Sequence, residues 1–361
     1  MRIGADGSYL RWQRDGMSRY LDGLLHSVEG LLPADDDLVV YYNSLDRQKL
    51  FAPTTRERAI RFPKATPWNQ LRVPIALRED KCDVYLGGAN IVPAYAPAPT
   101  VVVLHDCKPF RVPELVDPRW RIYLRVWLKR SVRHAAAVIV DSEWTAAECE
   151  HWFGVTPTRV VYPGVDPSFR PASAAEDVQE AEHLRTSLGL GAVPFVLQVG
   201  AFERHKGGDT AADAVDIIRG RGEDVMLVRC GRAGPVGGRS GVLDAGHVDD
   251  MTLRALYHRA AVVVVTSTHE GFGLPVVEAM ASDTPVVAVR ATALPEVGGD
   301  AAVYATPGDA GSVAAGLTTL LRDPGEVARR RAAGRLQATK FQWTTAGEAV
   351  LDVLRGVAKK R

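Results

Sequence analysis

The sequence contains no long apolar run. None of its hydrophobic stretches approaches the ~20 residues that a membrane-spanning helix needs. The first residues, MRIGAD, lead directly into polar positions and lack the apolar core of a secretory signal peptide. We therefore expect a cytoplasmic protein.

Cysteine is scarce, and neither sign of charge is in excess. Cys82, Cys107, Cys149 and Cys230 are far apart and show no paired metal-ligand spacing, which favours reduced thiols. With 44 basic and 43 acidic residues, the net charge is +1. The composition therefore gives no support for a nucleic-acid partner.

Two patterns that would indicate other chemistry are also absent. No G-x-G-x-x-G follows the first predicted strand, which counts against a dinucleotide-dependent dehydrogenase. The acidic run at 35–37 precedes a predicted strand and is interpreted as a solvated turn, and we find no convincing D-x-D constellation. We expect no catalytic metal and no cofactor.

Predicted strands and helices alternate along the chain, which is typical of an α/β protein with parallel sheets. At 361 residues the chain is long for one compact domain, so we expect two. A Pro/Gly segment at 163–167, PGVDP, marks the boundary. The pattern predicts Rossmann-like domains at 1–165 and 166–340, with a final helix at about 341–361.

The stretch 262–289 reads as strand, glycine loop, helix and strand. The run Val262–Val265 suits a buried parallel strand, and Gly271 and Gly273 allow a tight turn before a helix at 275–281. Backbone N–H groups at such a helix start attract phosphate. Glu270 and Glu278 flank the turn and offer acceptors for sugar hydroxyls. The alternative is an ordinary strand–helix turn with solvated glutamates.

The segment 270–281, EGFGLPVVEAMA, resembles the signature of retaining glycosyltransferases of family 4, which have the GT-B fold. The resemblance implies two Rossmann-like domains whose parallel sheets face each other across a cleft. It implies that Glu270 contacts the transferred sugar and that Glu278 holds the nucleoside ribose. It assigns the diphosphate and sugar to the amides of Phe272, Gly273 and Leu274.

A basic loop follows the first predicted strand of the second domain. The strand at 194–199 leads into Arg204-His205-Lys206-Gly207-Gly208, whose charge suits a diphosphate leaving group. Exposed loop charges are the alternative. The loop resembles the family's V-G-x-x-x-x-R-K-N motif, whose Arg and Lys grip the phosphates. Lys206 aligns directly, whereas His205 occupies the Arg position and Arg204 lies one residue earlier.

Two further turns resemble donor-binding segments of the family. The segment 15–20, DGMSRY, resembles a G-I-G-R-Y loop that faces the donor phosphates, with Gly16 matching and Ser18 replacing the second glycine. The segment 245–248, AGHV, resembles a G-x-V turn that lines the base pocket and includes Val248. Taken alone, the single glycine of the first segment favours a plain turn.

A predicted strand at 100–104 delivers His105 and Asp106 to its carboxyl end, where α/β proteins place their sites. A single histidine is more often structural. The stretch resembles a family segment in which this histidine approaches the transferred sugar, and Pro113 also matches. A neutral ring would donate to a hydroxyl, and Asp106 is interpreted as a structural partner.

The segment 118–134 has the most lopsided charge in the chain. It carries six Arg and Lys residues and no acid, and aromatic and leucine residues recur at helical spacing. One interpretation is an amphipathic surface helix that covers the core. The other is a patch for an anionic acceptor or for peripheral contact with the inner membrane face.

The resemblance covers nearly the whole chain and implies a retaining transferase with the active site in the cleft. It would move a hexosyl group from a nucleotide-diphosphate sugar to a hydroxyl of a glycan, a lipid-linked sugar or a small metabolite. Two segment forms resemble the mannosyl- or rhamnosyl-transferring branch, so GDP-mannose is the first expectation. A sugar phosphorylase or synthase and a non-catalytic nucleotide-sugar-binding protein are the alternatives.

Overall fold

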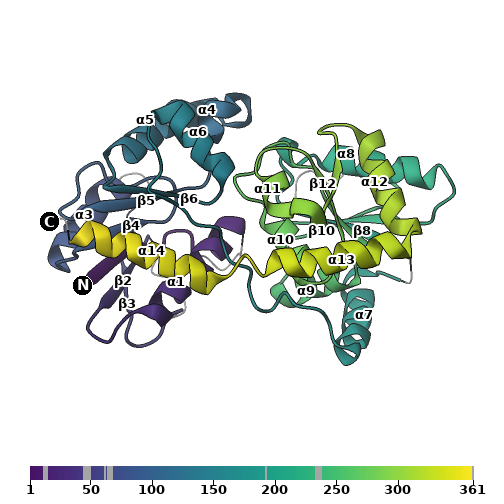
Figure 1. Cartoon of the computed structure of the whole chain (residues 1–361), viewed down its shortest axis with the longest axis horizontal. Coiled ribbons are helices and arrows are strands. Elements are labelled where there is room, and N and C mark those ends of the chain that lie inside the picture. Colours follow the sequence, from purple (N-terminus) through teal and green to yellow (C-terminus); the bar gives the residue numbers. More distant parts are fainter. Residues whose placement is uncertain are drawn as a thin grey trace. The chain divides into compact units, whose positions relative to one another are not determined.

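A computed structural model describes residues 1–10, 15–43, 50–60, 62, 68–191, 193–231 and 238–359. The chain divides into two compact units (Figure 1): unit 1 comprises Met1–Gly164 with Gln342–Arg361, and unit 2 comprises Val165–Phe341. Each unit is an α/β domain built on one parallel sheet. The predicted α/β class with two Rossmann-like domains is confirmed.

The sheet of unit 1 has seven strands in the order β3-β2-β1-β4-β5-β6-β7. The order changes direction between β1 and β4, which is the point where doubly wound sheets open a crevice at the carboxyl ends of their strands. The strands are β1 Arg2–Asp6, β2 Asp37–Tyr42, β3 Arg56–Ala59, β4 Val84–Gly87, β5 Thr100–Leu104, β6 Ala137–Val140 and β7 Arg159–Val160. β1, β4, β5 and β6 are almost entirely buried, as their apolar runs predict.

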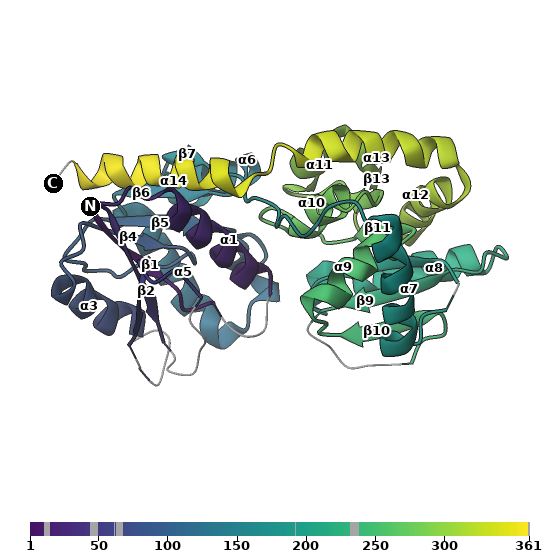
Figure 2. The same ribbon diagram turned by 90° about the horizontal axis from the view of Figure 1, so that it is seen from below.

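Helices cover the sheet of unit 1, and the last helix of the chain belongs to this layer. The helices are α1 Gly16–Leu31, η1 Trp68–Arg72, α3 Val73–Glu79, α4 Lys108–Arg111, η2 Pro113–Leu115, α5 Pro118–His134, α6 Glu143–Phe153 and α14 Trp343–Ala358. α14 lies along α1 (Figure 2), and the Ser27 hydroxyl donates to the Trp343 carbonyl at 2.6 Å. The approach is close because α1 has Gly23, where a Cβ would overlap the Trp343 ring.

The sheet of unit 2 has six strands in the order β10-β9-β8-β11-β12-β13, which changes direction between β8 and β11. The strands are β8 Phe195–Val199, β9 Met226–Cys230, β10 Val242–Gly246, β11 Val262–Val265, β12 Val286–Val289 and β13 Val303–Ala305. The helices are α7 Ala174–Leu188, η3 Arg204–Lys206, α8 Gly208–Arg219, α9 Asp250–Arg259, α10 Leu274–Ala281, α11 Leu294–Gly298, η4 Gly299–Ala301, α12 Ala310–Arg322 and α13 Pro324–Ala338.

Some elements differ from the sequence-based expectation. The polar strand β3, RERA, was not predicted, because an edge strand that is half exposed needs no apolar run. The edge strand β7 is short, with only the two residues Arg159–Val160. α14 begins at Trp343, and Phe341 belongs to unit 2; residues 360–361 lie outside the described chain. None of the described helices has the length and apolarity needed to cross a bilayer.

Candidate functional site

The centre of the candidate site lies where the sheet of unit 2 changes direction. β8 and β11 are neighbours in the sheet, with Val196 opposite Val262. Because both strands are parallel, the loops that follow them leave the same edge. The first loop carries Lys206 and the second carries Glu270, so the fold brings together two residues that are 64 positions apart.

Lys206 and Glu270 form a tight ion pair. The Lys206 Nζ lies 2.7 Å from Oε1 and 2.9 Å from Oε2 of Glu270. The side chains are 26% and 14% exposed, so the pair faces solvent on one side only. Burial alone would raise the pKa of the Glu270 carboxyl, but the charge and hydrogen bonds of Lys206 hold it below its usual value. Glu270 is therefore ionised and Lys206 supplies its counter-charge.

Backbone hydrogen bonds hold the two loops in place. The Glu270 N–H donates to the Thr292 hydroxyl at 3.0 Å. On the other loop, the Lys206 carbonyl accepts from the Gln198 amide at 3.0 Å and from the Thr266 hydroxyl at 2.9 Å. Both charged residues thus start from fixed backbone positions, which is a requirement for preorganised electrostatics.

The turn after Glu270 presents a helix start without a side-chain cap. Gly273 has φ 109° and ψ 53°, and a Cβ there would lie 2.8 Å from Leu294, so glycine is required on two counts. Pro275 lacks an N–H group. Within the described residues, the N–H groups of Gly273 and Leu274 donate to no acceptor. They can serve an anion. Phe272 is buried and packs edge-on against Phe341, at 5.4 Å between ring centroids.

A cavity of about 580 Å³ lies beside Lys206, between the end of β8, the start of α8 and the end of β11. Arg204 lines it, is exposed, and forms no ion pair with any residue that the structure describes. Arg229 also lines the cavity, but Asp244 binds its guanidinium at 2.5 and 2.8 Å. Among the basic residues that line the cavity, Lys206, Arg229 and Arg239 each pair with a described acidic residue, and Arg204 does not.

The remaining predicted donor-binding residues lie in different surroundings. Glu278 is buried in α10 and accepts a hydrogen bond from the Tyr257 hydroxyl of α9 at 2.7 Å. Val248 follows β10, two strands from β8 at the same edge of the sheet. Gly16 begins α1 of unit 1, where the Asp15 side chain already caps the helix by accepting from the Ser18 N–H at 2.9 Å.

His105 lies at the carboxyl end of β5 in unit 1 and is buried. Its Nδ1 lies 3.1 Å from the Asp141 carboxylate and its Nε2 lies 2.8 Å from the Gly88 carbonyl. Burial lowers the pKa of His105, but Asp141 and the Gly88 carbonyl outweigh burial, and the net direction is upward. Because both partners accept, the arrangement favours a charged ring over the neutral one expected from the sequence.

Three residues that hold the site were not predicted: Asp141, Tyr257 and Thr292. Asp141 could have been identified, because it directly follows β6, the strand next to β5, and so reaches the same edge as His105. Tyr257 and Thr292 had no sequence signal, since each acts through tertiary contacts made 21 or 22 residues away. Asp106 instead accepts from the Lys108 N–H at the start of α4. No cluster suited to a metal ion occurs among the described side chains.

Comparison with known proteins places the chain in a family. The profile described as Glycosyltransferase Family 4 matches residues 15–169, and the profile described as Glycosyl transferases group 1 matches residues 181–337. O-antigen chain mannosyltransferase B of Escherichia coli is 30% identical over 289 residues, covering 74% of this chain and 73% of the relative. A D-inositol 3-phosphate glycosyltransferase of Xylanimonas cellulosilytica is 31% identical, with coverages of 69% and 63%.

Solved structures agree in fold. Anabaena Alr3699/HepE, determined with UDP and glucose, has a TM-score of 0.78 at 20% identity, covering 99% of this chain and 100% of that one. WaaG, a glycosyltransferase involved in lipopolysaccharide biosynthesis, has a TM-score of 0.74 at 16% identity, with the same coverages. The chain therefore belongs to glycosyltransferase family 4, has the GT-B fold, and is a glycosyltransferase that acts on nucleotide sugars.

Proposed function

We propose that this enzyme transfers a mannosyl group from GDP-mannose to a hydroxyl acceptor with retention of configuration, and that it needs no metal ion. The observation that carries the proposal is the Lys206–Glu270 pair beside the uncapped turn at Gly273. It combines a cation, a carboxylate and open amides at the switch point of one sheet. A nucleotide sugar offers the complementary diphosphate and hydroxyl groups.

Lys206 and the amides of Gly273 and Leu274 are proposed to bind the departing diphosphate. The bond from the sugar C1 to the diphosphate oxygen breaks while a bond to the acceptor oxygen forms on the same face. The acceptor proton passes to the leaving phosphate oxygen. Fixed cations and dipoles offset the negative charge that builds on the leaving group, so a divalent metal is unnecessary.

Glu270 and Glu278 are proposed to contact the donor through its hydroxyls. When Lys206 turns to the phosphate, the Glu270 carboxylate becomes free to accept from the transferred sugar and to stabilise positive charge at C1. Glu278, oriented by Tyr257, would accept from the ribose. Arg204 would bind the diphosphate from the cavity side.

The choice of mannose rests on relatives. Besides the Escherichia coli protein, the MMP alpha-(1->4)-mannosyltransferase of Mycolicibacterium hassiacum is 41% identical over 128 residues. The acceptor is proposed to be a glycan or lipid-linked hydroxyl, in keeping with the O-antigen chain of the first relative. The match to the Mycolicibacterium protein covers 33% of this chain, so it supports the choice of mannose less than the Escherichia coli relative does.

A thermal-shift screen of nucleoside diphosphate sugars tests the donor directly. The proposal predicts the largest stabilisation with GDP-mannose, unchanged by EDTA, because ligand binding raises the folded-state stability. Product analysis by NMR, with the acceptor supplied, should show the α-configuration of the donor kept. A larger thermal shift with UDP-glucose would contradict the choice of GDP-mannose as the donor. Turnover of a sugar 1-phosphate without nucleotide would indicate a phosphorylase instead.

A further inference from the structure

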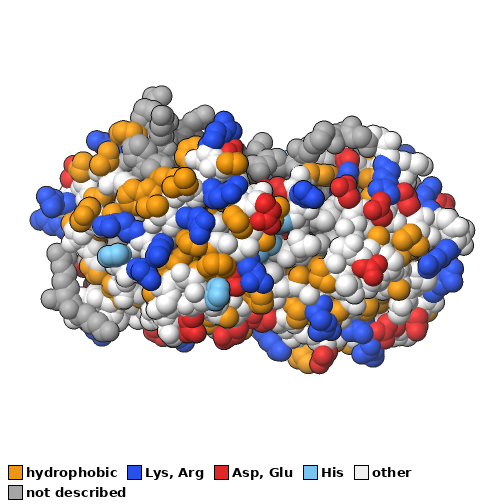
Figure 3. Space-filling view, turned by 90° about the horizontal axis from the view of Figure 1, so that it is seen from above, with side chains coloured by type: hydrophobic (Ala, Val, Ile, Leu, Met, Phe, Trp, Pro, Cys, Tyr) orange, Lys and Arg blue, Asp and Glu red, His pale blue; other side chains and the backbone are white. Residues whose placement is uncertain are grey.

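Helix α5 of unit 1 exposes large apolar side chains to solvent. Ile122 is 75% exposed, Val126 is 56% exposed and Trp120 is 55% exposed, whereas only Leu128, Ser131 and Val132 of the helix are buried. Exposed apolar groups that gather on one element mark an interaction surface rather than a core-facing helix. Figure 3 looks onto this side of unit 1 and shows orange side chains interleaved with blue ones.

The same helix carries positive charge that the protein leaves largely uncompensated. Of its six Arg and Lys residues, Arg119 is the one for which the described residues provide an ion pair, with Asp117 at 2.7 Å. Arg125 stacks 4.9 Å from the Phe110 ring, and Lys129 is exposed. Because the whole chain has a net charge of +1, α5 is a local concentration of charge and not part of a basic protein.

Aromatic rings extend this face toward a cavity. Trp120, Tyr123 and Trp127 follow each other at helical spacing, with ring centroids 5.9 Å and 6.1 Å apart. The next turn brings Arg130, whose guanidinium lies 5.2 Å from the ring of Tyr95. Tyr95 is 80% exposed and belongs to a proline-rich loop at 92–99.

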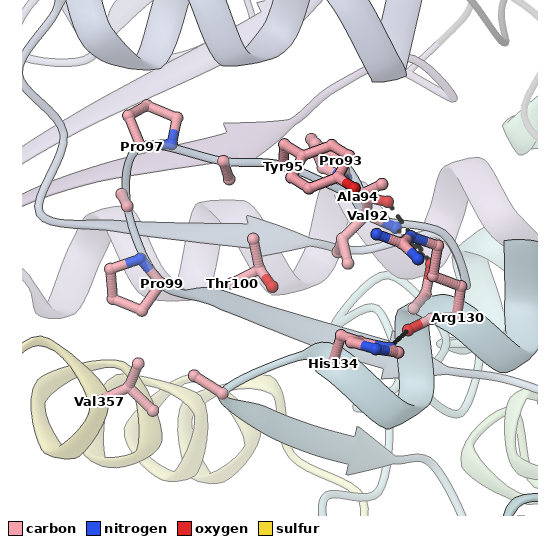
Figure 4. Close-up of a pocket in the computed structure, with 14 residues that line it drawn as sticks. Val92, Pro93, Ala94, Tyr95, Pro97, Pro99, Thr100, Arg130, His134 and Val357 are labelled. Carbon is pink, nitrogen blue, oxygen red and sulfur yellow. Dashed lines mark hydrogen bonds between the residues drawn. The ribbon is translucent and has the colours of Figure 1, made fainter.

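The cavity, of about 600 Å³, lies between that loop and the carboxyl-terminal end of α5 (Figure 4). Prolines and alanines of the loop form one wall, and Arg130 and His134 form another. Thr100 and Ala136 line its floor at the starts of β5 and β6. It is therefore at the opposite edge of the sheet from His105 and is separate from the candidate donor site.

We propose that α5 and the loop at 92–99 dock unit 1 onto an anionic phospholipid bilayer, with Arg130 and His134 holding a headgroup phosphate in the cavity. Exposed aromatic and aliphatic groups mixed with unpaired cations are the composition of helices that lie in a membrane interface. Arginine suits a phosphate through paired N–H donors. The inference is independent of the donor and of the reaction proposed above.

Co-sedimentation of the full chain with vesicles tests the proposal. Binding is expected with phosphatidylcholine mixed with phosphatidylglycerol, and much less with phosphatidylcholine alone. The variant K129Q/R130Q should lower the partition coefficient about twenty-five-fold, since each basic residue near an anionic surface contributes about fivefold. The variant I122S/V126S should lower it more than tenfold, because it removes the groups that enter the interface.

The control variant R331Q/L336S changes an exposed arginine and an exposed leucine on α13 of unit 2, where Leu336 is 71% exposed. It should bind vesicles as the unchanged protein does. Equal binding to both vesicle types, or equal loss in the control, would overturn the proposal. A dimer that involves α5 and forms without vesicles would overturn it too. If R130Q/H134Q binds anionic vesicles as strongly as the unchanged protein does, the proposed headgroup site in the cavity is wrong.

Discussion

The Lys206 ammonium contacts both carboxylate oxygens of Glu270, at 2.7 Å and 2.9 Å, from the loops after two adjacent parallel strands. The pair keeps a cation at the edge of a cavity and beside a helix start with open amides. In the proposed mechanism, donor binding exchanges one anionic partner of Lys206, the Glu270 carboxylate, for another, the diphosphate. The positive charge of Lys206 is thus in place before the substrate arrives. The Glu270 carboxylate stays ionised and can accept hydrogen bonds from the sugar hydroxyls.

Replacing Lys206 by methionine should lower kcat about a hundredfold or more, because the fixed cation no longer stabilises the leaving diphosphate. The KM for the donor should change less. The rate is measured as release of the nucleoside diphosphate. R331M, on exposed α13 of the same unit, should keep normal turnover, whereas normal turnover by K206M would remove Lys206 from the mechanism.

The ion pair should also give the protein a pH-dependent stability. The pKa of Glu270 is lowered from 4.5 in the folded state. Its contribution is therefore fully present above pH 4.5 and is lost as the pH falls through the lower folded-state value. Urea unfolding across this acidic range should show a slope that E270Q lacks. Identical slopes for both proteins would mean that the pair is broken in solution.

His105 should titrate in the opposite sense. Its pKa is raised above 6.5, so its contribution to stability is fully present below pH 6.5 and is lost as the pH rises through the folded-state value. NMR titration of the ring, assigned with H105Q, measures the pKa directly. In D141N the pKa should fall, because burial then acts without the carboxylate. An unchanged pKa in D141N would show that Asp141 does not hold the ring.

Gly273→Ala should destabilise the protein by about 1–3 kcal/mol and weaken donor binding, because φ 109° and the contact with Leu294 both exclude a Cβ. Gly308 is a matched control. It has φ +75° and open space around it, so G308A should lose only the free energy of placing alanine at a positive φ, with no steric overlap. Thermal or urea unfolding should show the larger loss for G273A, and equal losses would mean that the turn relaxes.

Tyr257→Phe should raise the donor KM about fivefold at nearly constant kcat, since one hydrogen bond of about 1 kcal/mol orients Glu278. Steady-state kinetics with the preferred nucleotide sugar measure the effect. A fall in kcat with unchanged KM would assign Glu278 to the chemical step rather than to ribose binding.

The sequence was sufficient for the fold and for the elements that carry the site. Apolar β-branched runs such as Val262–Val265 favour buried strands, and the glycines around Phe272 favour a turn. Residues that act across the fold were not predictable. Tyr257 and Thr292 reach Glu278 and Glu270 from other elements, and nothing in their local sequence distinguishes them from ordinary surface positions.

The His105 result shows a second limit of the sequence. The position of His105 at the end of β5 was correctly expected, because the end of a strand can be predicted from the end of its hydrophobic run. The groups that face its ring were not predicted, because the Asp141 carboxylate follows a neighbouring strand and the Gly88 carbonyl lies 17 residues earlier in the chain. The charge state of a buried side chain depends on tertiary contacts, which a single sequence motif does not show.

Calorimetric binding of the nucleoside diphosphate and monophosphate of the preferred donor tests the central claim most directly. K206M should bind the diphosphate at least tenfold more weakly than the unchanged enzyme, since a charge-assisted phosphate contact of about 1.5–3 kcal/mol is lost. Its affinity for the monophosphate, which lacks the β-phosphate, should stay the same. Equal affinity of K206M and the unchanged enzyme for the diphosphate would contradict the account.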